Sequence, residues 1–430
     1  MVFLPHWPIA KERSSMKLNL HRIKSLLRVL GDPHKKLPVI HVAGTNGKGS
    51  TVAFIRSILE KAGLTVHVFT SPHIERFNER ISLAGSEIAD DYLYAILEEC
   101  RIAAEKHNIE ASFFEGTTAA AFLAFSRHSA DIVILEVGLG GRLDATNVIE
   151  NPLISVITPI SYDHTNILGN SLKKIAAEKA CIIKPKIPCV VSLQRPEVHK
   201  VIENYADKQN SPLIRYEYDF GVSIEKGLLS YKAENLNIKT NPPSLLGYHQ
   251  YINAAAAIAT VSHIKEIKIT PQHIAKGITS ATWKGRLQKI TCGRLHKLLP
   301  VNWELFVDAA HNEAGAQSCA AWLKDQKKMK TCLIVGMTQN RDPEKFLKQF
   351  QPLVSKVICV SIDHEPMNYQ AHEMIELIHD KKLKAISFAW EKVEDALLHI
   401  LHLEQKSDKI RIIVTGSIFL IADFFARNRN

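Results

Sequence analysis

The stretch of sequence that decides the fold is LPVIHVAGTNGKGSTVAFIRSILEKAG, residues 37–63. Residues 37–43 are apolar and rich in β-branched side chains, which is typical of a strand buried on both faces. Residues 49–62 have the period of a helix, because one stripe is formed by Val52, Ile55, Leu59 and Ala62. Gly63 is a stop signal for that helix. The stretch therefore predicts a strand, a glycine-rich loop and a helix, in that order.

The same alternation continues outward along the chain. We expect helices over residues 18–30, 91–107 and 118–127, and strands over 66–70, 131–137, 153–158 and 188–192. Short alternating segments between residues 216 and 248, around Glu225-Lys226-Gly227, predict a β-hairpin insertion. After Gly285, further strands are expected at 303–307, 331–336, 356–362, 384–388 and 411–415.

This order predicts an α/β protein of two domains. Residues 1–287 would form a P-loop ATPase-like domain with a mostly parallel sheet and a small β insertion. Residues 288–430 would form a smaller, Rossmann-like α/β domain.

Composition limits the classes of function. The 430 residues are 46% hydrophobic and 23% charged, with no apolar run of the ~20 residues that span a bilayer, so we expect no membrane partner. The net charge of +10 comes from Lys and Arg spread along the chain, without a basic block interleaved with aromatics, and we expect no nucleic-acid partner. Seven dispersed cysteines indicate reduced thiols and a cytoplasmic location.

The glycine loop itself, residues 44–50, predicts binding of ATP. Backbone amides at a helix start converge on phosphate oxygens, and Lys48 would reach the β- and γ-phosphates. The hydroxyls of Ser50 and Thr51 are candidates to support the loop or a metal. The spacing departs from the common P-loop, because two residues rather than four separate Gly44 and Gly47, and Gly49 follows the lysine. The alternative is a plain glycine turn.

Two strand ends carry polar side chains that suit a metal beside phosphates. Glu136 ends the strand predicted at 131–137, at the edge where parallel sheets bind ligands, and a carboxylate is a preferred ligand of Mg²⁺. His164 follows the strand predicted at 153–158, at the same edge. A salt-bridged Glu and a structural His are the alternatives.

Nine short motifs together resemble folylpolyglutamate synthases, a branch of the Mur ligase superfamily. They occur in family order over nearly the whole chain: GTNGKGS (44–50), SPH (71–73), FNERI (77–81), EVGLGGRLDATN (136–147), DHT (163–165), EKA (178–180), WKGR (283–286), DAAHN (308–312) and TGS (415–417). One departure follows the eighth of these motifs: Glu313 stands directly after DAAHN, in a stretch where the family commonly carries a proline.

The resemblance implies a role for each matching residue. Magnesium ligands, for two ions, would be Ser71, Glu136, His164 and Lys179, the last as a carbamate. A partly desolvated lysine has a lowered pKa, and its neutral amine can add CO₂. Catalytic residues would be Lys48, Glu136, His164, Lys179 and His311. ATP would be held by Gly44, Thr45, Asn46, Gly47, Lys48, Gly49, Ser50, Asn253, Arg286 and Asp308, and the pteroate or folate by Ser112, Phe113, Phe114, Leu143, Asp144 and Ala145.

The implied reaction is ATP-dependent amide formation. A substrate carboxylate attacks the γ-phosphate of ATP to give an acyl phosphate, and the amine of L-glutamate then displaces phosphate. The acceptors would be 7,8-dihydropteroate, giving dihydrofolate, and tetrahydrofolate, to which glutamates are added. We expect a monomer. Alternatives are the folate-lengthening activity alone, another Mur-type ligase acting on a cell-wall precursor, or a P-loop switch that needs no second substrate.

Overall fold

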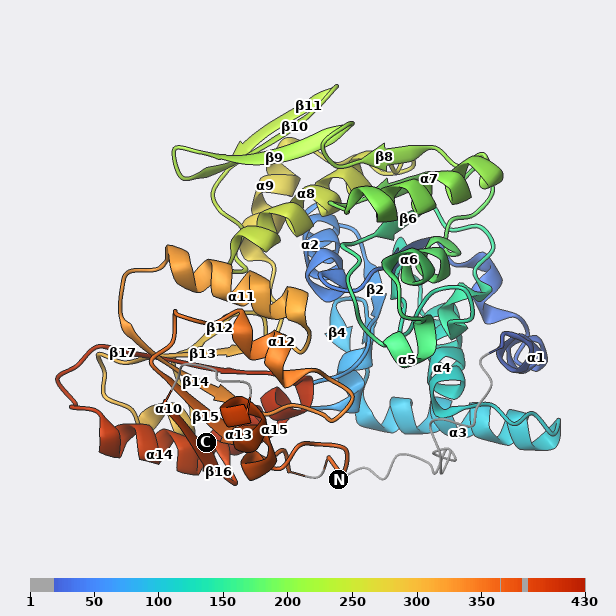
Figure 1. Ribbon diagram of the computed structural model, residues 1–430. Coiled ribbons are helices and arrows are strands. Elements are labelled where there is room, and N and C mark those ends of the chain that lie inside the picture. Colours follow the sequence, from blue (N-terminus) through green and yellow to red (C-terminus); the bar gives the residue numbers. More distant parts are fainter. Residues whose placement is uncertain (1–18, 364, 381–385, 430) are drawn as a thin grey trace. The chain divides into compact units, whose positions relative to one another are not determined.

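The deciding stretch folds as strand β1 (Val39–Ala43), a glycine loop and helix α2 (Lys48–Lys61) in the computed structural model (Figure 1). The structure describes residues 19–363, 365–380 and 386–429. Within them the chain divides into two compact units. The first holds residues 19–161, 165–244 and 251–281, and the second holds residues 162–164, 245–250 and 282–429.

An eight-stranded sheet organises the first unit, in the order β4-β3-β2-β5-β1-β6-β7-β8. Its strands are β1, β2 (Val66–Phe69), β3 (Ile81–Leu83), β4 (Ser86–Glu87), β5 (Ile132–Glu136), β6 (Ile154–Ile157), β7 (Cys189–Val191) and β8 (Leu213–Arg215). All pairings are parallel except those of β3 with β2 and with β4. Because β1 lies between β5 and β6, the ends of these three strands meet at one edge of the sheet, where such folds bind ligands.

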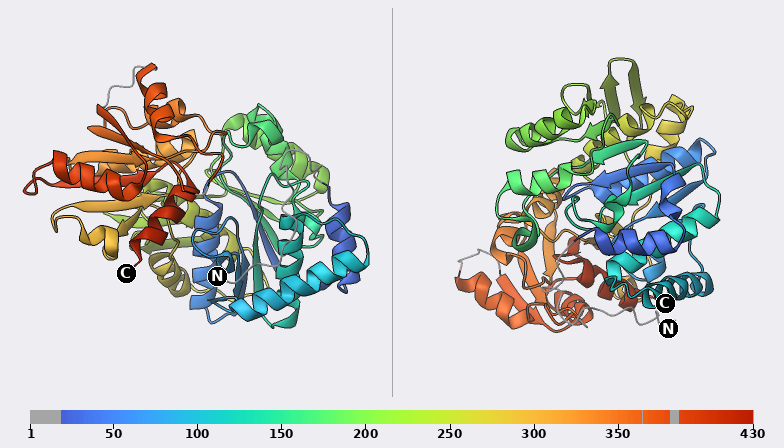
Figure 2. Two further views of the ribbon diagram at one scale, coloured as in Figure 1. Left: turned by 90° about the horizontal axis from the view of Figure 1, so that it is seen from below. Right: turned by 90° about the vertical axis from the view of Figure 1, so that its right-hand side faces the viewer.

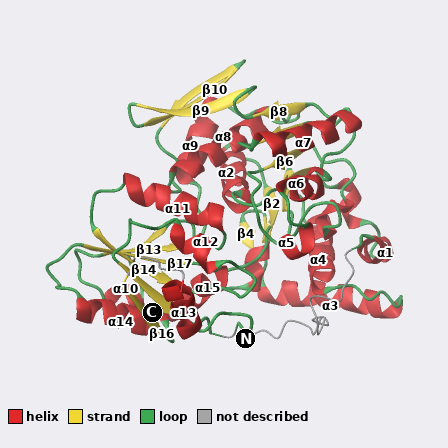
Figure 3. Cartoon of the chain, viewed as in Figure 1, coloured by secondary structure: helices red, strands yellow, loops and turns green. Residues whose placement is uncertain are grey.

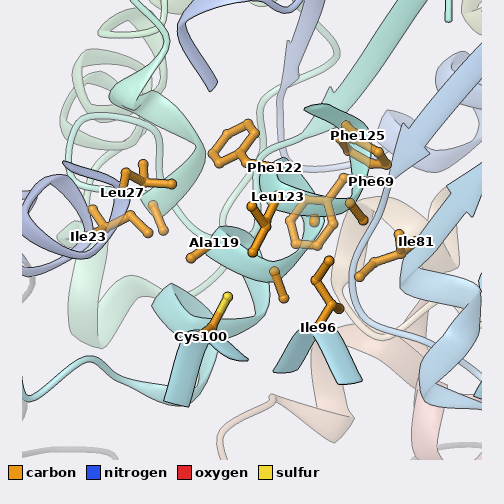
Figure 4. Packing of buried hydrophobic residues seen from close by; sticks show 14 of the residues in the cluster. Ile23, Leu27, Phe69, Ile81, Ile96, Cys100, Ala119, Phe122, Leu123 and Phe125 are labelled. Carbon is orange, nitrogen blue, oxygen red and sulfur yellow. The ribbon is translucent and has the colours of Figure 1, made fainter. Parts of the chain in front are cut away.

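Helices lie on both sides of this sheet (Figure 2). The helices of the first unit are α1 (His21–Val29), α2, α3 (Asp90–Lys106), α4 (Phe113–Arg127), α5 (Thr165–Leu168), α6 (Leu172–Ala180), α7 (Pro196–Gln209), most of α8 (Tyr248–Ser262) and α9 (Pro271–Ser280). Short 3₁₀ helices are η1 (Pro33–Lys36), η2 (Phe77–Arg80) and η3 (Ala145–Val148). In the main core, shown in Figure 4, α1, α3 and α4 bury Ile23, Ile96 and Phe122 against strand residues such as Phe69. Burial of this apolar surface holds the strand ends, and hence the edge, in place.

A small antiparallel sheet in the order β11-β10-β9 also belongs to the first unit (Figure 3). Its strands are β9 (Phe220–Glu225), β10 (Leu228–Ala233) and β11 (Leu236–Thr240). The predicted insertion is therefore present, but it has a third strand beyond the expected hairpin.

The second unit contains a six-stranded sheet in the order β12-β13-β17-β14-β15-β16, parallel except for β12. Its strands are β12 (Gln288–Ile290), β13 (Glu304–Asp308), β14 (Lys330–Val335), β15 (Lys356–Val360), β16 (Ile386–Trp390) and β17 (Ile410–Thr415). Its helices are α10 (Arg294–Lys297), α11 (Glu313–Asp325), α12 (Pro343–Lys348), α13 (Ala371–Asp380), α14 (Val393–Leu403) and α15 (Ile418–Asn428).

The prediction of an α/β fold with mostly parallel sheets is confirmed. One helix start was wrong: α4 begins at Phe113, five residues before the predicted start at Thr118. Part of the strand predicted at 384–388 lies outside the described residues. Among the described residues, no helix combines the length and the apolar character required to cross a membrane.

Candidate functional site

The phosphate loop is fixed to the strand end beside it. The backbone amides of Thr45 and Asn46 both donate to the carbonyl of Pro159, at 3.0 and 3.1 Å. The Thr45 Oγ1 donates to the carbonyl of Ser161 at 3.2 Å, and the Asn46 side-chain amide donates to its hydroxyl at 2.9 Å. The loop after β1 is therefore fixed by the segment after β6. The next amides belong to the first turn of α2, where backbone N–H groups lack acceptors within the helix.

Two glycines of this loop occupy positions that other residues would not fit. Gly44 has φ +152°, and a Cβ there would lie 1.8 Å from the Thr158 hydroxyl. Gly47 has φ +85°, and a Cβ there would lie 2.4 Å from the side-chain oxygen of Asn253. Asn253 is buried within α8 rather than at a helix start, and it contacts the loop directly. The structure thus brings this predicted ATP-binding residue to the phosphate loop.

Lys48, Glu136 and Ser71 meet at the ends of β1, β5 and β2. The Lys48 Nζ donates to the carbonyls of Gly44 and Thr45, each at 3.3 Å, and lies 3.9 Å from a carboxylate oxygen of Glu136. The other oxygen of Glu136 accepts from the backbone amide of Ser71 at 3.4 Å. Glu136 is 5% exposed, so this carboxylate sits at the edge of the site with a cation beside it.

Lys179 reaches the same loop from helix α6. It is buried, and its Nζ donates to the carbonyl of Gly44 at 2.9 Å. Burial lowers the pKa of Lys179, the positive charge of Lys48 acts in the same direction, and together they bring it to about 7. A large fraction of the amine is therefore neutral near pH 7, which is the form that adds CO₂.

The donor set suits a magnesium ion held jointly by protein and phosphates. Within the described parts of the chain, no group of three or more His, Cys, Asp and Glu side chains gathers to hold a metal. Mg²⁺ requires fewer protein ligands than that, because it commonly takes one or two carboxylates together with phosphates and water. Glu136 and the hydroxyl of Ser71 are hard oxygen donors on adjacent strand ends, so the residues fit such an ion.

The predicted pteridine residues begin helix α4. Ser112 caps the helix: its amide donates to the Glu115 carboxylate at 2.7 Å, and its hydroxyl accepts from the Glu115 amide at 3.3 Å. Phe113 and Phe114 are half-buried, with ring centroids 5.8 Å from Phe77 and 6.0 Å from Phe69, respectively. Both rings pack on apolar neighbours, while each residue keeps some accessible surface.

The second predicted stretch, Leu143-Asp144-Ala145, is organised around the buried Asp144 carboxylate. That carboxylate accepts from the amide of Leu139 at 2.8 Å, and from the amide and hydroxyl of Thr146 at 3.0 and 2.6 Å. Burial raises the pKa of Asp144 in spite of these bonds. Leu143 is half-buried and Ala145 is buried. The geometry indicates that Asp144 holds the loop after β5 in shape.

In the second unit, Asp308 ends β13 and is buried. Its carboxylate accepts from the backbone amides of Leu287 and Ala310, at 2.7 and 2.8 Å. Burial raises its pKa, while the charge of Arg286 acts in the opposite direction, so the two predicted residues are neighbours. The same Arg286 charge, after burial, contributes to lowering the pKa of His249 to about 4.

His311 and His164 both lie near the Asp163 carboxylate of this unit. The Nε2 of His311 is 3.3 Å from one oxygen of Asp163, which also accepts from the Asn312 side chain at 3.1 Å. His164 is partly exposed, has φ +49°, and donates its backbone amide to Asp163 at 2.7 Å. Arg341 completes the set of ion pairs on Asp163.

The chain matches known proteins over nearly its whole length. Residues 42–261 match the Mur ligase middle domain, and residues 291–427 match the dihydrofolate synthetase C-terminal domain. It is 34% identical to the dihydrofolate synthase/folylpolyglutamate synthase of Bacillus subtilis, covering 98% of this chain and 97% of the relative. The corresponding Haemophilus influenzae protein is 31% identical, and the match covers 98% of this chain and 97% of that relative.

Solved structures agree. The structure described as Escherichia coli FolC in complex with DHPP and ADP matches with a TM-score of 0.87 and 27% identity, covering 98% of this chain and 96% of that one. Folylpolyglutamate synthase of Mycobacterium tuberculosis, complexed with ADP, matches with a TM-score of 0.84, 27% identity and coverage of 95% and 94%. The chain belongs to the folylpolyglutamate synthase family. The predicted membership, in the Mur ligase superfamily, is confirmed, and the chain is an ATP-dependent ligase.

The family departure at Glu313 has a simple physical account. Glu313 is the first residue of α11, after the cap Asn312, whose side chain accepts from the Gly315 amide at 2.9 Å. That first helical position favours proline, and it also favours a negative charge near the helix N-terminus. The folylpolyglutamate synthase turn therefore forms with glutamate in place of proline.

Sequence reasoning missed the residues that fix the phosphate loop. Thr158, Pro159 and Ser161 follow β6 and contact the loop, but Thr158 was predicted only as the end of a strand and the other two were not predicted at all. The available signal was position, since the end of a strand adjacent to β1 must lie beside the loop after β1.

Proposed function

We propose that this ligase joins L-glutamate to 7,8-dihydropteroate, forming dihydrofolate, and also to tetrahydrofolate, extending a γ-glutamyl chain. The observation that carries the proposal is the meeting of Lys48, Glu136 and Lys179 at a glycine loop, in a chain of this family. Relatives with the two-activity name, from Bacillus subtilis and Haemophilus influenzae, support both reactions. A relative named folylpolyglutamate synthase, from Lacticaseibacillus casei, at 32% identity keeps the single-activity alternative open to test.

ATP is the proposed co-substrate, bound by residues 44–50 with Asn253, Arg286 and Asp308. The relatives solved with ADP support this assignment. Lys48 would offset charge on the phosphates, and the first-turn amides of α2 would bind their oxygens. His311 would line the nucleotide site. We propose residues 1–287 and 288–430 as the two functional domains, in a cytoplasmic monomer.

Magnesium would be held by Ser71, Glu136, His164 and a carbamate on Lys179. When bound, the ion neutralises phosphate charge during attack of the acceptor carboxylate. The lowered pKa of Lys179, to about 7, supports the carbamate, because it keeps the amine neutral near physiological pH. The buried carbonyl contact to Gly44 would have to be exchanged when the amine is modified.

The pteridine ring would lie against Phe113 and Phe114, beside the loop of Leu143, Asp144 and Ala145. Aromatic faces stack on flat heterocycles, and both phenylalanines retain accessible surface. Ser112 would contribute by capping α4 and so fixing the position of the two rings.

Phosphate release from ATP tests the function directly. Purified protein should release phosphate only when both an acceptor and L-glutamate are present, with 7,8-dihydropteroate and tetrahydrofolate assayed separately. Phosphate release with tetrahydrofolate and L-glutamate, but not with 7,8-dihydropteroate and L-glutamate, would favour the single-activity alternative. Release without any acceptor would indicate a switch-like ATPase and would refute the ligase proposal.

The carbamate has its own test. Protein equilibrated with ¹³C-bicarbonate should give a carbamate signal in NMR that Lys179→Ala lacks, and short-chain carboxylates should restore part of the activity of Lys179→Ala. An unmodified amine in wild-type protein under bicarbonate would refute the carbamate.

A further inference from the structure

Arg80, at the end of η2, carries a buried positive charge with unused hydrogen-bonding capacity. The residue is 8% exposed. Its Nε donates to Nδ1 of His73 at 2.8 Å, and within the described residues Nη1 and Nη2 form no hydrogen bond. Neither nitrogen is among the described side-chain atoms that are buried without a hydrogen-bond partner, so both reach solvent although most of the side chain is buried. The outer edge of the guanidinium is therefore open to a ligand.

The nearby carboxylates are committed elsewhere. Glu79 accepts from the backbone amides of Ile74, Glu75 and Arg76, at 2.7, 3.0 and 3.1 Å. Glu136 faces Lys48. Both carboxylates are close enough to raise the pKa of Arg80, but burial outweighs them and brings it to about 10. Arg80 therefore remains charged at neutral pH.

The Arg80 guanidinium lies over two aromatic rings. Its Cζ lies 5.3 Å from the ring centroid of Phe77 and 5.9 Å from that of Phe113. The two rings meet edge to face, at 77°. With Nε bonded to His73, the remaining donors are those of the Nη1 and Nη2 edge. That edge matches a planar anion with two oxygens, such as a carboxylate.

His73 adds a donor next to this edge. Because its Nδ1 accepts from Arg80 Nε, the ring proton lies on Nε2.

We propose that Arg80, supported by His73, binds the carboxylate of the acceptor substrate that is to be activated. This inference rests on the proposed function. Phe113 presents its ring to the aromatic part of an acceptor, and Glu136 marks the phosphate end of the site, so a carboxylate beside Arg80 lies between the two. Arg80 is a substrate-binding residue in this proposal, and its charge offsets repulsion between the substrate carboxylate and Glu136.

Binding without ATP tests the proposal. The ligands are 7,8-dihydropteroate and an analogue in which hydrogen replaces the carboxylate. Arg80→Gln should weaken binding of dihydropteroate by about 10- to 100-fold, the value of a hydrogen bond to a charged group, and should leave the analogue within about twofold. Arg80→Lys, which keeps the charge and loses the planar edge, should show most of the same loss.

Arg76→Gln is the matched control, because Arg76 lies four residues earlier, is exposed and pairs with Asp90. It should bind both ligands as wild type does. If Arg80→Lys lost equal affinity for dihydropteroate and for the analogue, Arg80 would have a packing role and the inference would be overturned. A change confined to the KM for ATP, in the complete reaction, would overturn it as well. If wild-type protein binds no dihydropteroate at all, the proposed function fails first and the inference falls with it.

Discussion

Replacing Lys179 by methionine should stabilise the protein while abolishing its reaction. The side chains are similar in length, so Lys179→Met removes the charge and the donor with little change in volume. The folded pKa is about 7 against 10.5 for the ordinary group, so burying the ammonium disfavours the folded state. At about 1.4 kcal/mol per pH unit, the gap corresponds to about 5 kcal/mol. Loss of the hydrogen bond to Gly44 offsets about 1 kcal/mol of the gain.

The sign of the pH dependence follows from proton counting. Between the two pKa values the unfolded lysine is protonated and the folded one is largely neutral, so the unfolded state binds more protons and stability rises with pH. The destabilisation that results from burying the Lys179 ammonium is fully present below about pH 7 and disappears above about pH 10.5. Relative to Lys179→Met, wild-type protein should therefore gain about 2 kcal/mol of unfolding free energy between about pH 7 and pH 9.

The assay is urea unfolding followed by far-UV circular dichroism, in CO₂-free buffers without magnesium, at a series of pH values. Lys173→Met is the control, because Lys173 is exposed on the same helix. It should change neither the stability nor its slope. If Lys179→Met and wild type show parallel pH profiles, Lys179 titrates like a solvated lysine and the reasoning is refuted. A Lys179→Met protein that keeps wild-type ligation would separately refute its catalytic role.

Three further changes test the site. Glu136→Gln should lower the affinity for Mg²⁺ by at least roughly 10- to 100-fold, which is the effect of losing a residue that only supports a metal ligand. A magnesium titration of phosphate release measures this affinity. Near-normal ligation at saturating magnesium would show the metal assignment to be wrong. Gly47 has φ +85° and faces Asn253, so Gly47→Ala adds about 1–2 kcal/mol of backbone strain and a clash. The affinity for ADP, measured by titration calorimetry, should therefore fall by about tenfold or more. Unchanged affinity would argue against a rigid loop. Asp144→Asn should lower stability by about 1–3 kcal/mol, read as a fall in melting temperature; an unchanged melting temperature with a raised KM for dihydropteroate would assign Asp144 to substrate instead.

Local pattern was sufficient for most of the parallel strands, though not for β8, and for the edge where the site lies. The apolar run before Gly44 and the buried run before Glu136 define two adjacent strands, and parallel pairing then brings both strand ends together. The short strands β3, β4, β8 and β12 were not predicted, because two or three residues without a continuous buried apolar run carry too little pattern. The equally short β7 was predicted because its residues, Cys189–Val191, are all apolar and buried. The start of α4 was set too late although Ser112 and Glu115 form a capping box, which is a readable signal for a helix start.

The unusual spacing of the glycine loop follows from its neighbours rather than from phosphate binding alone. Gly44 must lack a side chain because the Thr158 hydroxyl occupies that space, and its carbonyl accepts from both Lys48 and Lys179. Gly47 must lack a side chain because the side chain of Asn253 occupies the space where its Cβ would lie. The contacts from Thr158, Lys179 and Asn253 come from segments far along the chain, so residues 44–50 by themselves do not explain the pattern. One carbonyl shared by two lysines also explains why Lys48 contributes to the low pKa of Lys179: burial is the larger cause, and the positive charge of the residue that would bind phosphate adds to it.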